Sequence, residues 1–205
     1  MSRAPAVLAV AGLLCGCSTS SSSSSSSSTS LAPRLGAAPR GAEHHSALAF
    51  STASAELVQS EPSPGSCRYR GQGLFAQPDP GCTPGALNPQ VTPASIATTI
   101  CAEGWTETVR PPERVSEAEK RAAMAAYGNR GSQRSVEFDH LVPLELGGAV
   151  NAASNLWPEP GANPNPKDEL ERRLNQLVCV GELSLAAAQQ AIASDWVAAY
   201  GRYAR

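Results

Sequence analysis

The chain has 205 residues, with 16 Lys and Arg against 18 Asp and Glu, which gives a formal net charge of −2 at pH 7. This balance excludes a protein that binds nucleic acid through a broadly basic surface, because neutralising phosphates supplies most non-specific affinity. Any phosphate contact therefore has to come from a local group of arginines. The length suits one domain with additional terminal segments.

Residues 1–16 have the features of a lipoprotein signal peptide. Arg3 precedes an apolar run, residues 6–14, that is too short to span a bilayer as a helix. The run ends in Leu-Cys-Gly before Cys17 and resembles a bacterial lipobox, which implies cleavage before Cys17 and a lipid anchor on its sulfur. The alternative is ordinary signal-peptide cleavage without a lipid. We expect an exported lipoprotein of the bacterial cell envelope, in the outer membrane and periplasm or at the cell surface.

Residues 17–65 are expected to form a disordered tether. Ser and Thr make up almost all of residues 18–30, and Ala, Pro, Gly and Ser dominate as far as residue 65. Such a composition buries too little apolar surface to fold. We therefore predict one folded domain over residues 66–205, a monomer held away from the membrane.

Four cysteines remain for this domain if Cys15 leaves with the signal peptide and Cys17 carries lipid. An even number in an exported protein favours two disulfides. Three pairings are open, and we expect Cys67–Cys82, which would close a local Gly- and Pro-rich loop, together with Cys101–Cys179. A zinc site is the alternative, although no pair has the short Cys-x-x-Cys spacing that zinc sites favour.

The pattern of the domain is helix-rich α+β. Before the centre of the domain, we expect a short helix over 92–100, an extended segment over 105–112, and a helix that starts at the capping box Ser116-Glu117-Ala118-Glu119 and ends near Tyr127. After the centre, apolar residues at helical spacing predict helices over 166–180, with Gly181 as its stop, and from Ser184 to Tyr200.

The centre of the domain is an Asp-His pair that follows a short strand. Residues 135–138 alternate polar and apolar side chains, so Asp139 and His140 are expected at the end of a strand, with their side chains on opposite faces. A neutral imidazole can accept a proton from water near pH 7, and a carboxylate can hold a hard cation. Pro143 and Gly147-Gly148 then favour a ribbon that turns back, and Asn155 on the second arm could fix the His140 ring through its backbone or its amide.

These residues resemble the signature of the HNH endonucleases of the ββα-metal superfamily. The signature residues are Asp139-His140, Pro143, Gly147-Gly148 and Asn155-Leu156. A longer similarity to a group of small secreted bacterial HNH-like proteins covers roughly residues 78–200. The resemblance implies a ββα-metal core over about 133–180, in which a β-ribbon and the following helix surround one divalent cation.

The function that the resemblance implies is metal-dependent hydrolysis of phosphodiester bonds in DNA, and in RNA as a further option. His140 would be the base, assisted by Asn155, and Asp139, Asn165 and Asp168 would be metal ligands. Mg²⁺ is the expected ion because oxygen ligands suit hard cations, with Mn²⁺, Ca²⁺ and Zn²⁺ as alternatives. Asn165 has a second interpretation, since Asn165-Pro166-Lys167-Asp168 is also the start of a helix with Asn as its N-cap.

A second function stays open beside the nuclease. No histidine follows His140 in the chain, whereas HNH enzymes usually have one near the following helix. The alternative is therefore a catalytically silent HNH-like scaffold that serves as a binding or structural lipoprotein of the envelope. For the nuclease, Arg130 and Arg134 are the nearest arginines before the Asp-His pair and are the predicted phosphate contacts.

Overall fold

The computed structural model describes residues 47–161 and 163–204. The chain divides into two units, Met1–Ala42 and Glu43–Arg205, and everything described lies in the second unit. The predicted signal peptide, the lipidation site Cys17 and most of the predicted tether lie outside the described residues.

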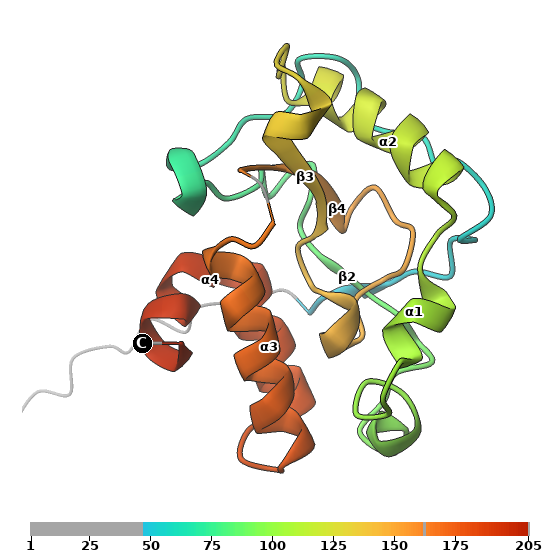
Figure 1. The fold of residues 1–205 in the computed structure, drawn as a ribbon, viewed down its shortest axis with the longest axis vertical. Coiled ribbons are helices and arrows are strands. Elements are labelled where there is room, and N and C mark those ends of the chain that lie inside the picture. The colour runs from blue at the N-terminus through green and yellow to red at the C-terminus, as the bar shows by residue number, and fades with distance from the viewer. Residues whose placement is uncertain (1–46, 162, 205) are drawn as a thin grey trace, which may run out of the picture. The chain divides into compact units, whose positions relative to one another are not determined.

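The described unit is α+β, as predicted (Figure 1). Its strands are β1 (Ala49–Phe50), β2 (Ala86–Leu87), β3 (Val136–His140) and β4 (Leu156–Pro160). Its α-helices are α1 (Trp105–Val109), α2 (Glu113–Ala126), α3 (Pro166–Cys179) and α4 (Leu185–Tyr203), and four single 3₁₀ turns are η1 (Gly73–Phe75), η2 (Ile96–Thr98), η3 (Gln133–Ser135) and η4 (Leu144–Leu146). β1 and β2 pair in parallel, whereas β3 and β4 form an antiparallel ribbon.

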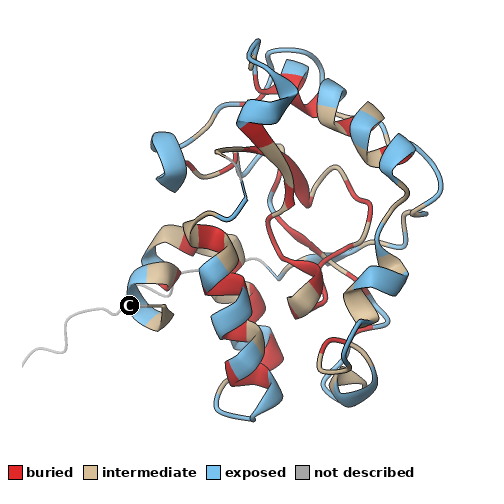
Figure 2. Ribbon diagram, in the orientation of Figure 1, coloured by how far each residue is buried: buried red, intermediate tan, exposed pale blue. Residues whose placement is uncertain are grey.

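The β3–β4 ribbon lies at the centre of the unit, and the loop between its strands depends on glycine. The register pairs Asp139 with Trp157 and His140 with Leu156. In the connecting loop, a Cβ on Gly148 would lie 1.7 Å from the Val142 carbonyl oxygen, so only glycine fits there. Helix α2 packs on β4, and most of the ribbon is buried beneath it (Figure 2).

Helix α3 follows the ribbon and begins where the sequence indicates. Asn165 is its N-cap, Pro166 occupies the first turn, and Asn165 and Asp168 form a reciprocal capping box. The apolar face of α3 packs on α4, which is capped by the Ser184 side chain. The buried residues on that face of α3 are Leu170, Leu174, Leu177 and Val178. The sequence β3, β4, α3 is thus an antiparallel ribbon followed by a helix.

Both expected disulfides are present. Cys67–Cys82 closes a local loop of 15 residues, and Cys101–Cys179 links two segments 78 residues apart, with Cα–Cα distances of 6.0 and 5.6 Å. The second bridge ties the turn after η2 to the last residue of α3 and so anchors the far end of that helix.

Four expectations about element bounds are wrong. The helix expected over 92–100 is only the 3₁₀ turn η2. The folded part starts by residue 47 rather than 66, because the backbone of 47–65 bonds to the body of the domain, for example through β1 and through Gln59 N–H to the Glu119 carboxylate (2.6 Å). Residues 105–109, expected to be extended, form α1 after the left-handed residue Gly104, whereas Arg110, before Pro111, and Pro112 are extended as predicted. Helix α2 begins at Glu113, ahead of the capping box expected at 116–119.

Candidate functional site

His140 ends strand β3 with its ring held in one tautomer. The Nε2 atom lies 2.9 Å from the Val150 carbonyl oxygen. Because a carbonyl only accepts hydrogen bonds, Nε2 carries the proton and Nδ1 keeps its lone pair. Burial lowers the pKa of His140 below its usual value, and the hydrogen bond to Val150 offsets part of this effect. The ring is therefore neutral at pH 7 and can accept a proton at Nδ1.

Asn155 holds the loop that carries this carbonyl group. Its side chain is fully buried and accepts from the Val142 N–H (3.0 Å) and the Ala86 N–H (3.3 Å). It donates to the carbonyl oxygens of Val142 (3.0 Å) and Ala149 (3.1 Å). The sequence allowed a direct contact between Asn155 and the His140 ring, but the Asn155 amide makes no hydrogen bond to that ring. It acts on the ring through Ala149, the residue before Val150.

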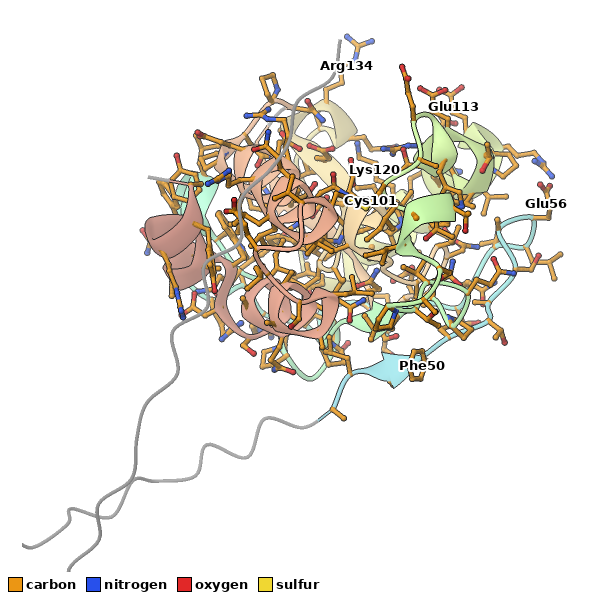
Figure 3. All side chains as sticks on the ribbon, turned by 90° about the horizontal axis from the view of Figure 1, so that it is seen from below. Phe50, Glu56, Cys101, Glu113, Lys120 and Arg134 are labelled. Atoms are coloured by element: carbon orange, nitrogen blue, oxygen red, sulfur yellow. A yellow bond between two sulfur atoms is a disulfide. The ribbon has the colours of Figure 1, made fainter. Side chains whose placement is uncertain are left out.

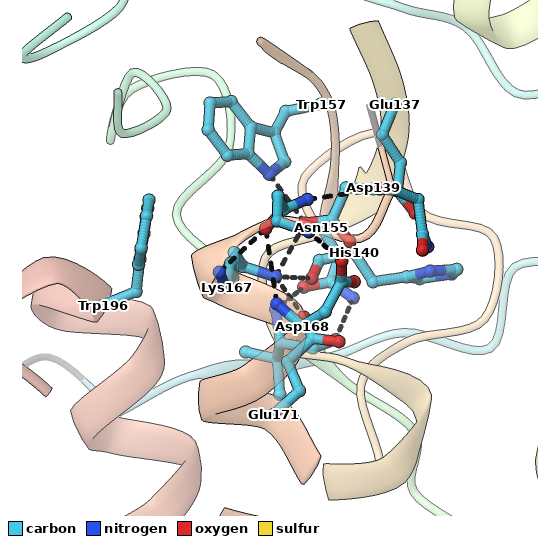
Figure 4. Close-up of polar contacts among 12 residues, drawn as sticks. Glu137, Asp139, His140, Asn155, Trp157, Lys167, Asp168, Glu171 and Trp196 are labelled. Atoms are coloured by element: carbon cyan, nitrogen blue, oxygen red, sulfur yellow. Dashed lines mark hydrogen bonds and ion pairs between the residues drawn. The ribbon is translucent and has the colours of Figure 1, made fainter. Parts of the chain in front are cut away.

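Asp139 points to the opposite side of β3 and is paired with a lysine (Figure 4). Its Oδ2 atom accepts from the Lys167 ammonium at 2.6 Å and from the Trp157 indole N–H at 3.1 Å. The ammonium also donates to the His140 backbone carbonyl at 2.8 Å and to the Glu171 carboxylate. Lys167 has no exposed surface and Asp139 is only 8% exposed, so this ion pair is part of the core.

The other two predicted metal ligands are engaged at the start of α3. The Asn165 side-chain oxygen accepts from the backbone N–H groups of Lys167 (2.7 Å) and Asp168 (3.3 Å), and its amide donates to Glu137 at 3.3 Å. The Asp168 carboxylate accepts from the Asn165 backbone N–H at 2.6 Å. Both side chains thus serve the helix cap, the second of the two interpretations that the sequence allowed for Asn165.

These contacts do not suit a divalent cation held by Asp139, Asn165 and Asp168. The side-chain oxygens of Asn165 and Asp168 accept hydrogen bonds from backbone N–H groups at the start of α3, and Asp139 faces the Lys167 ammonium. In the part of the chain that the structure describes, no three His, Cys, Asp or Glu side chains are grouped so that they could hold a metal ion. The predicted requirement for Mg²⁺ stays a prediction.

Two hollows meet at His140. A groove of about 800 Å³ runs between α2 and β3, and a smaller pocket of about 140 Å³ lies beside α3. Both are lined by His140 and Arg110, and Arg110 is close enough for its charge to contribute to the lowered pKa of His140. Arg134 lines only the groove and its exposed side chain extends outward (Figure 3). Arg130 lines a separate hollow on the other side of Gln133.

The groove carries both signs of charge. Its basic side chains are Arg110, Lys120 and Arg134, and its acidic ones are Glu113, Glu117, Glu119 and Glu137. The groove thus holds three cations as well as His140, while the acids keep it from being broadly basic. Binding of nucleic acid here would therefore be weak and sensitive to salt.

Comparison with models of known protein families, with curated proteins and with solved structures finds no match for this chain. Among the described residues, no helix combines the length and the apolar character needed to cross a bilayer.

Two residues of the site were not assigned roles from the sequence. Lys167 lay within the segment that resembles the HNH-like group, and its spacing of four from Glu171 is the signal that an ion pair on one helix face would give. Arg110 was not among the arginines predicted to contact phosphate. It lies 30 residues before His140 in the sequence, and only the tertiary fold brings it to the pocket.

Proposed function

We propose that this protein is a phosphodiester hydrolase of the HNH type that cleaves DNA, with RNA as a second substrate class. The observation that carries the proposal is the His140 ring, whose Nε2–H is fixed by Val150 so that Nδ1 keeps its lone pair, and which lines a pocket together with Arg110. An antiparallel ribbon that ends in such a histidine, followed by a helix, is the arrangement expected from the resemblance to HNH nucleases.

In the proposed reaction, His140 Nδ1 takes a proton from a water molecule, and the resulting hydroxide attacks the phosphorus. The bond from phosphorus to the 3′-oxygen breaks, which leaves a 5′-phosphate and, after protonation from solvent, a 3′-hydroxyl. Arg110, which lines the same pocket, is the side chain available to hold a non-bridging phosphate oxygen. The reaction proposed here uses no metal ion, because Asp139, Asn165 and Asp168 are engaged in other contacts.

The location of the protein belongs to the same proposal. We propose export by the segment 1–16 and attachment to the envelope through a lipid on Cys17, on the sequence features described above. The cysteines support export, because two disulfides form in the described unit and disulfides persist in oxidising compartments. A tethered monomer would meet nucleic acid outside the cytoplasm.

A second candidate is the catalytically silent scaffold, and the Asp139–Lys167 ion pair is the observation that favours it. Asp139 was expected to bind a metal ion, but it is paired with Lys167 and is only 8% exposed. In that case the groove would bind a partner without turnover, and the His140 ring would only brace the loop at Val150.

Cleavage assays on the full chain with both disulfides formed test the proposal. Supercoiled plasmid and single-stranded RNA are incubated with Mg²⁺, Mn²⁺, Ca²⁺, Zn²⁺ or EDTA. Nicking by the native chain should fall by about 100-fold or more in His140→Asn, since loss of a general base costs about 10²–10⁴ in rate. The remaining histidines, His44 and His45, lie outside the described residues and provide the matched control, because His44→Asn with His45→Asn should cleave normally. A folded protein that cleaves neither substrate under any condition would favour the silent scaffold.

A further inference from the structure

The centre of the ribbon-and-helix unit contains a largely buried charge cluster. Lys167 is the only cation in it among the described residues, and the carboxyls around it belong to Asp139, Glu159 and Glu171. Asp139 and Glu159 come from the two strands and Glu171 from α3, one turn after Lys167. All four residues are at most 8% exposed. The ammonium thus lies where the ribbon meets the helix.

The ammonium makes the contacts that a bound cation would make. It has three oxygen partners: Asp139 Oδ2, the His140 carbonyl oxygen and Glu171 Oε1. Three donors on an ammonium match three acceptors, so its hydrogen-bonding capacity is filled. One strand and one helix are joined through this single group, and one of its acceptors is the backbone of the proposed base.

The charges of the cluster agree with one built-in cation. Burial alone would lower the pKa of Lys167, but the neighbouring acidic groups, Asp139 first, outweigh it and raise that pKa, so the ammonium stays charged. Burial, followed by the charge of Asp139, raises the pKa of Glu159 far above its usual range. Glu159 is therefore neutral at pH 7, and its buried Oε1 atom has no hydrogen-bond partner. The Asp139 carboxylate, 2.6 Å away, balances the ammonium, whereas burial raises the pKa of Glu171 well above its usual range.

We propose that the Lys167 ammonium is the resident cation of this ribbon-and-helix site and takes the place of a divalent ion beside Asp139. Lys167 is fully buried and cannot reach a substrate, so it is a positioning residue. It fixes the end of β3 through Asp139 and the His140 carbonyl, and thereby holds the His140 ring at the pocket. The charge offered to a phosphate comes from Arg110 instead.

Two consequences follow, and only one rests on the proposed function. If the protein is a hydrolase, its cleavage should persist in EDTA. Independently of any activity, the native chain should bind no divalent ion at Asp139, whereas a chain with a small side chain at position 167 should gain such a site. The three oxygens that hold the ammonium, from Asp139, Glu171 and the His140 carbonyl, would then be free to bind a cation in its place.

The test measures Mn²⁺ binding by electron paramagnetic resonance, and the thermal midpoint Tm with Mn²⁺ or EDTA, on the full chain. For the native protein, Tm should be the same in both solutions and no bound Mn²⁺ should appear. For Lys167→Ala, Tm should be depressed in EDTA and rise by about 5 °C or more at a hundredfold excess of Mn²⁺ over its Kd. Arg172→Ala removes an exposed cation from the same helix and is the matched control, with no gain of binding.

The outcomes are separable. Native protein that binds Mn²⁺, with the binding lost in Asp139→Asn, would overturn the proposal, and so would a folded Lys167→Ala chain that takes up no Mn²⁺. If Lys167→Ala does not fold in EDTA, it is refolded with Mn²⁺, Mg²⁺ or Ca²⁺: recovery supports the proposal, and no recovery with any ion contradicts it. None of these readouts depends on cleavage, so a failure of the proposed hydrolase function would be recognised separately.

Discussion

Replacing Asn155 with alanine should destabilise the protein more than any exposed substitution in the ribbon. The side chain is fully buried and joins three segments, by four hydrogen bonds to the backbone of Ala86, Val142 and Ala149. Its loss leaves four buried backbone groups without a partner, and each such group costs about 1–3 kcal/mol. The weakest bond, at 3.3 Å, adds little, and water can enter part of the space that is left.

We therefore expect a loss of about 3–5 kcal/mol in the free energy of unfolding, a large part of the 5–15 kcal/mol typical of a domain. Urea unfolding followed by far-UV circular dichroism measures it, with the slope m checked for constancy. The control is Asn175→Ala, which removes two hydrogen bonds from a partly buried amide to the carbonyls of Ile100 and Glu145 and should cost about 1–2 kcal/mol. An equal loss of unfolding free energy in the two variants would refute the conclusion that the Asn155 hydrogen bonds are the main stabilising contacts of the loop.

Two pH profiles give further predictions. Because burial lowers the pKa of His140, cleavage should rise with pH through a midpoint below 6.5 and stay level to about pH 8, which initial rates on plasmid would show. A midpoint above 6.5 would contradict the environment described for the ring. Burial, and then the charge of Glu119, raises the pKa of Glu61 from 4.5 to about 7, so the folded state binds more protons than the unfolded state between these values. The free energy of unfolding should fall across this window as pH rises, by about 1–2 kcal/mol after allowance for solvent screening, and Glu61→Gln should flatten that slope.

The parts of the fold that were correctly predicted are those fixed by neighbours in the sequence. The start of α3 depends on Asn165, Pro166 and Asp168, which all lie within four residues and form the capping box directly. The strand before Asp139 was visible as an alternation of side chains, and it continues to His140. The disulfide pairing was one of three open choices, and its confirmation adds a long-range restraint on α3.

The site could be predicted only in part, because its decisive contacts join distant segments. His140 does lie at a pocket, but its orienting group is the carbonyl of Val150, which no side-chain pattern reveals. Asp139 was expected to face a cation, and it does, but the cation is the ammonium of Lys167, 28 residues away. An Asp, a Glu and a Lys in one region of a sequence can form a buried cluster or be solvated surface charges, and the sequence does not distinguish the two.

The segment 47–65 shows why composition alone placed the domain boundary too late. It has few apolar residues to bury, and Leu57 and Val58 are 65% and 57% exposed. What attaches it, besides the packing of Leu48 on the core, is hydrogen bonding of its backbone, both to β2 and to buried polar side chains of the domain. The Asn151 amide, fully buried, donates to the carbonyl oxygens of Ser54 (2.7 Å) and Leu57 (2.8 Å). Such contacts leave no hydrophobic pattern in the sequence.

This attachment can be tested by comparing two variants that each remove one contact to the segment. Asn151→Ala deletes the two buried hydrogen bonds and should speed backbone hydrogen exchange and proteolysis over 52–58 by about tenfold, as a local loss of 1–2 kcal/mol implies. Arg114→Ala deletes the ion pair to Glu56, in which the two side chains are 65% and 66% exposed, and Glu56 lies at the surface in Figure 3. This variant should have almost no effect, because an exposed pair contributes little. Release of the segment by Arg114→Ala to the same degree would mean that surface charge holds it. Since Asn151 directly follows Val150, Asn151→Ala should also slow cleavage if the docked segment steadies the carbonyl that orients His140.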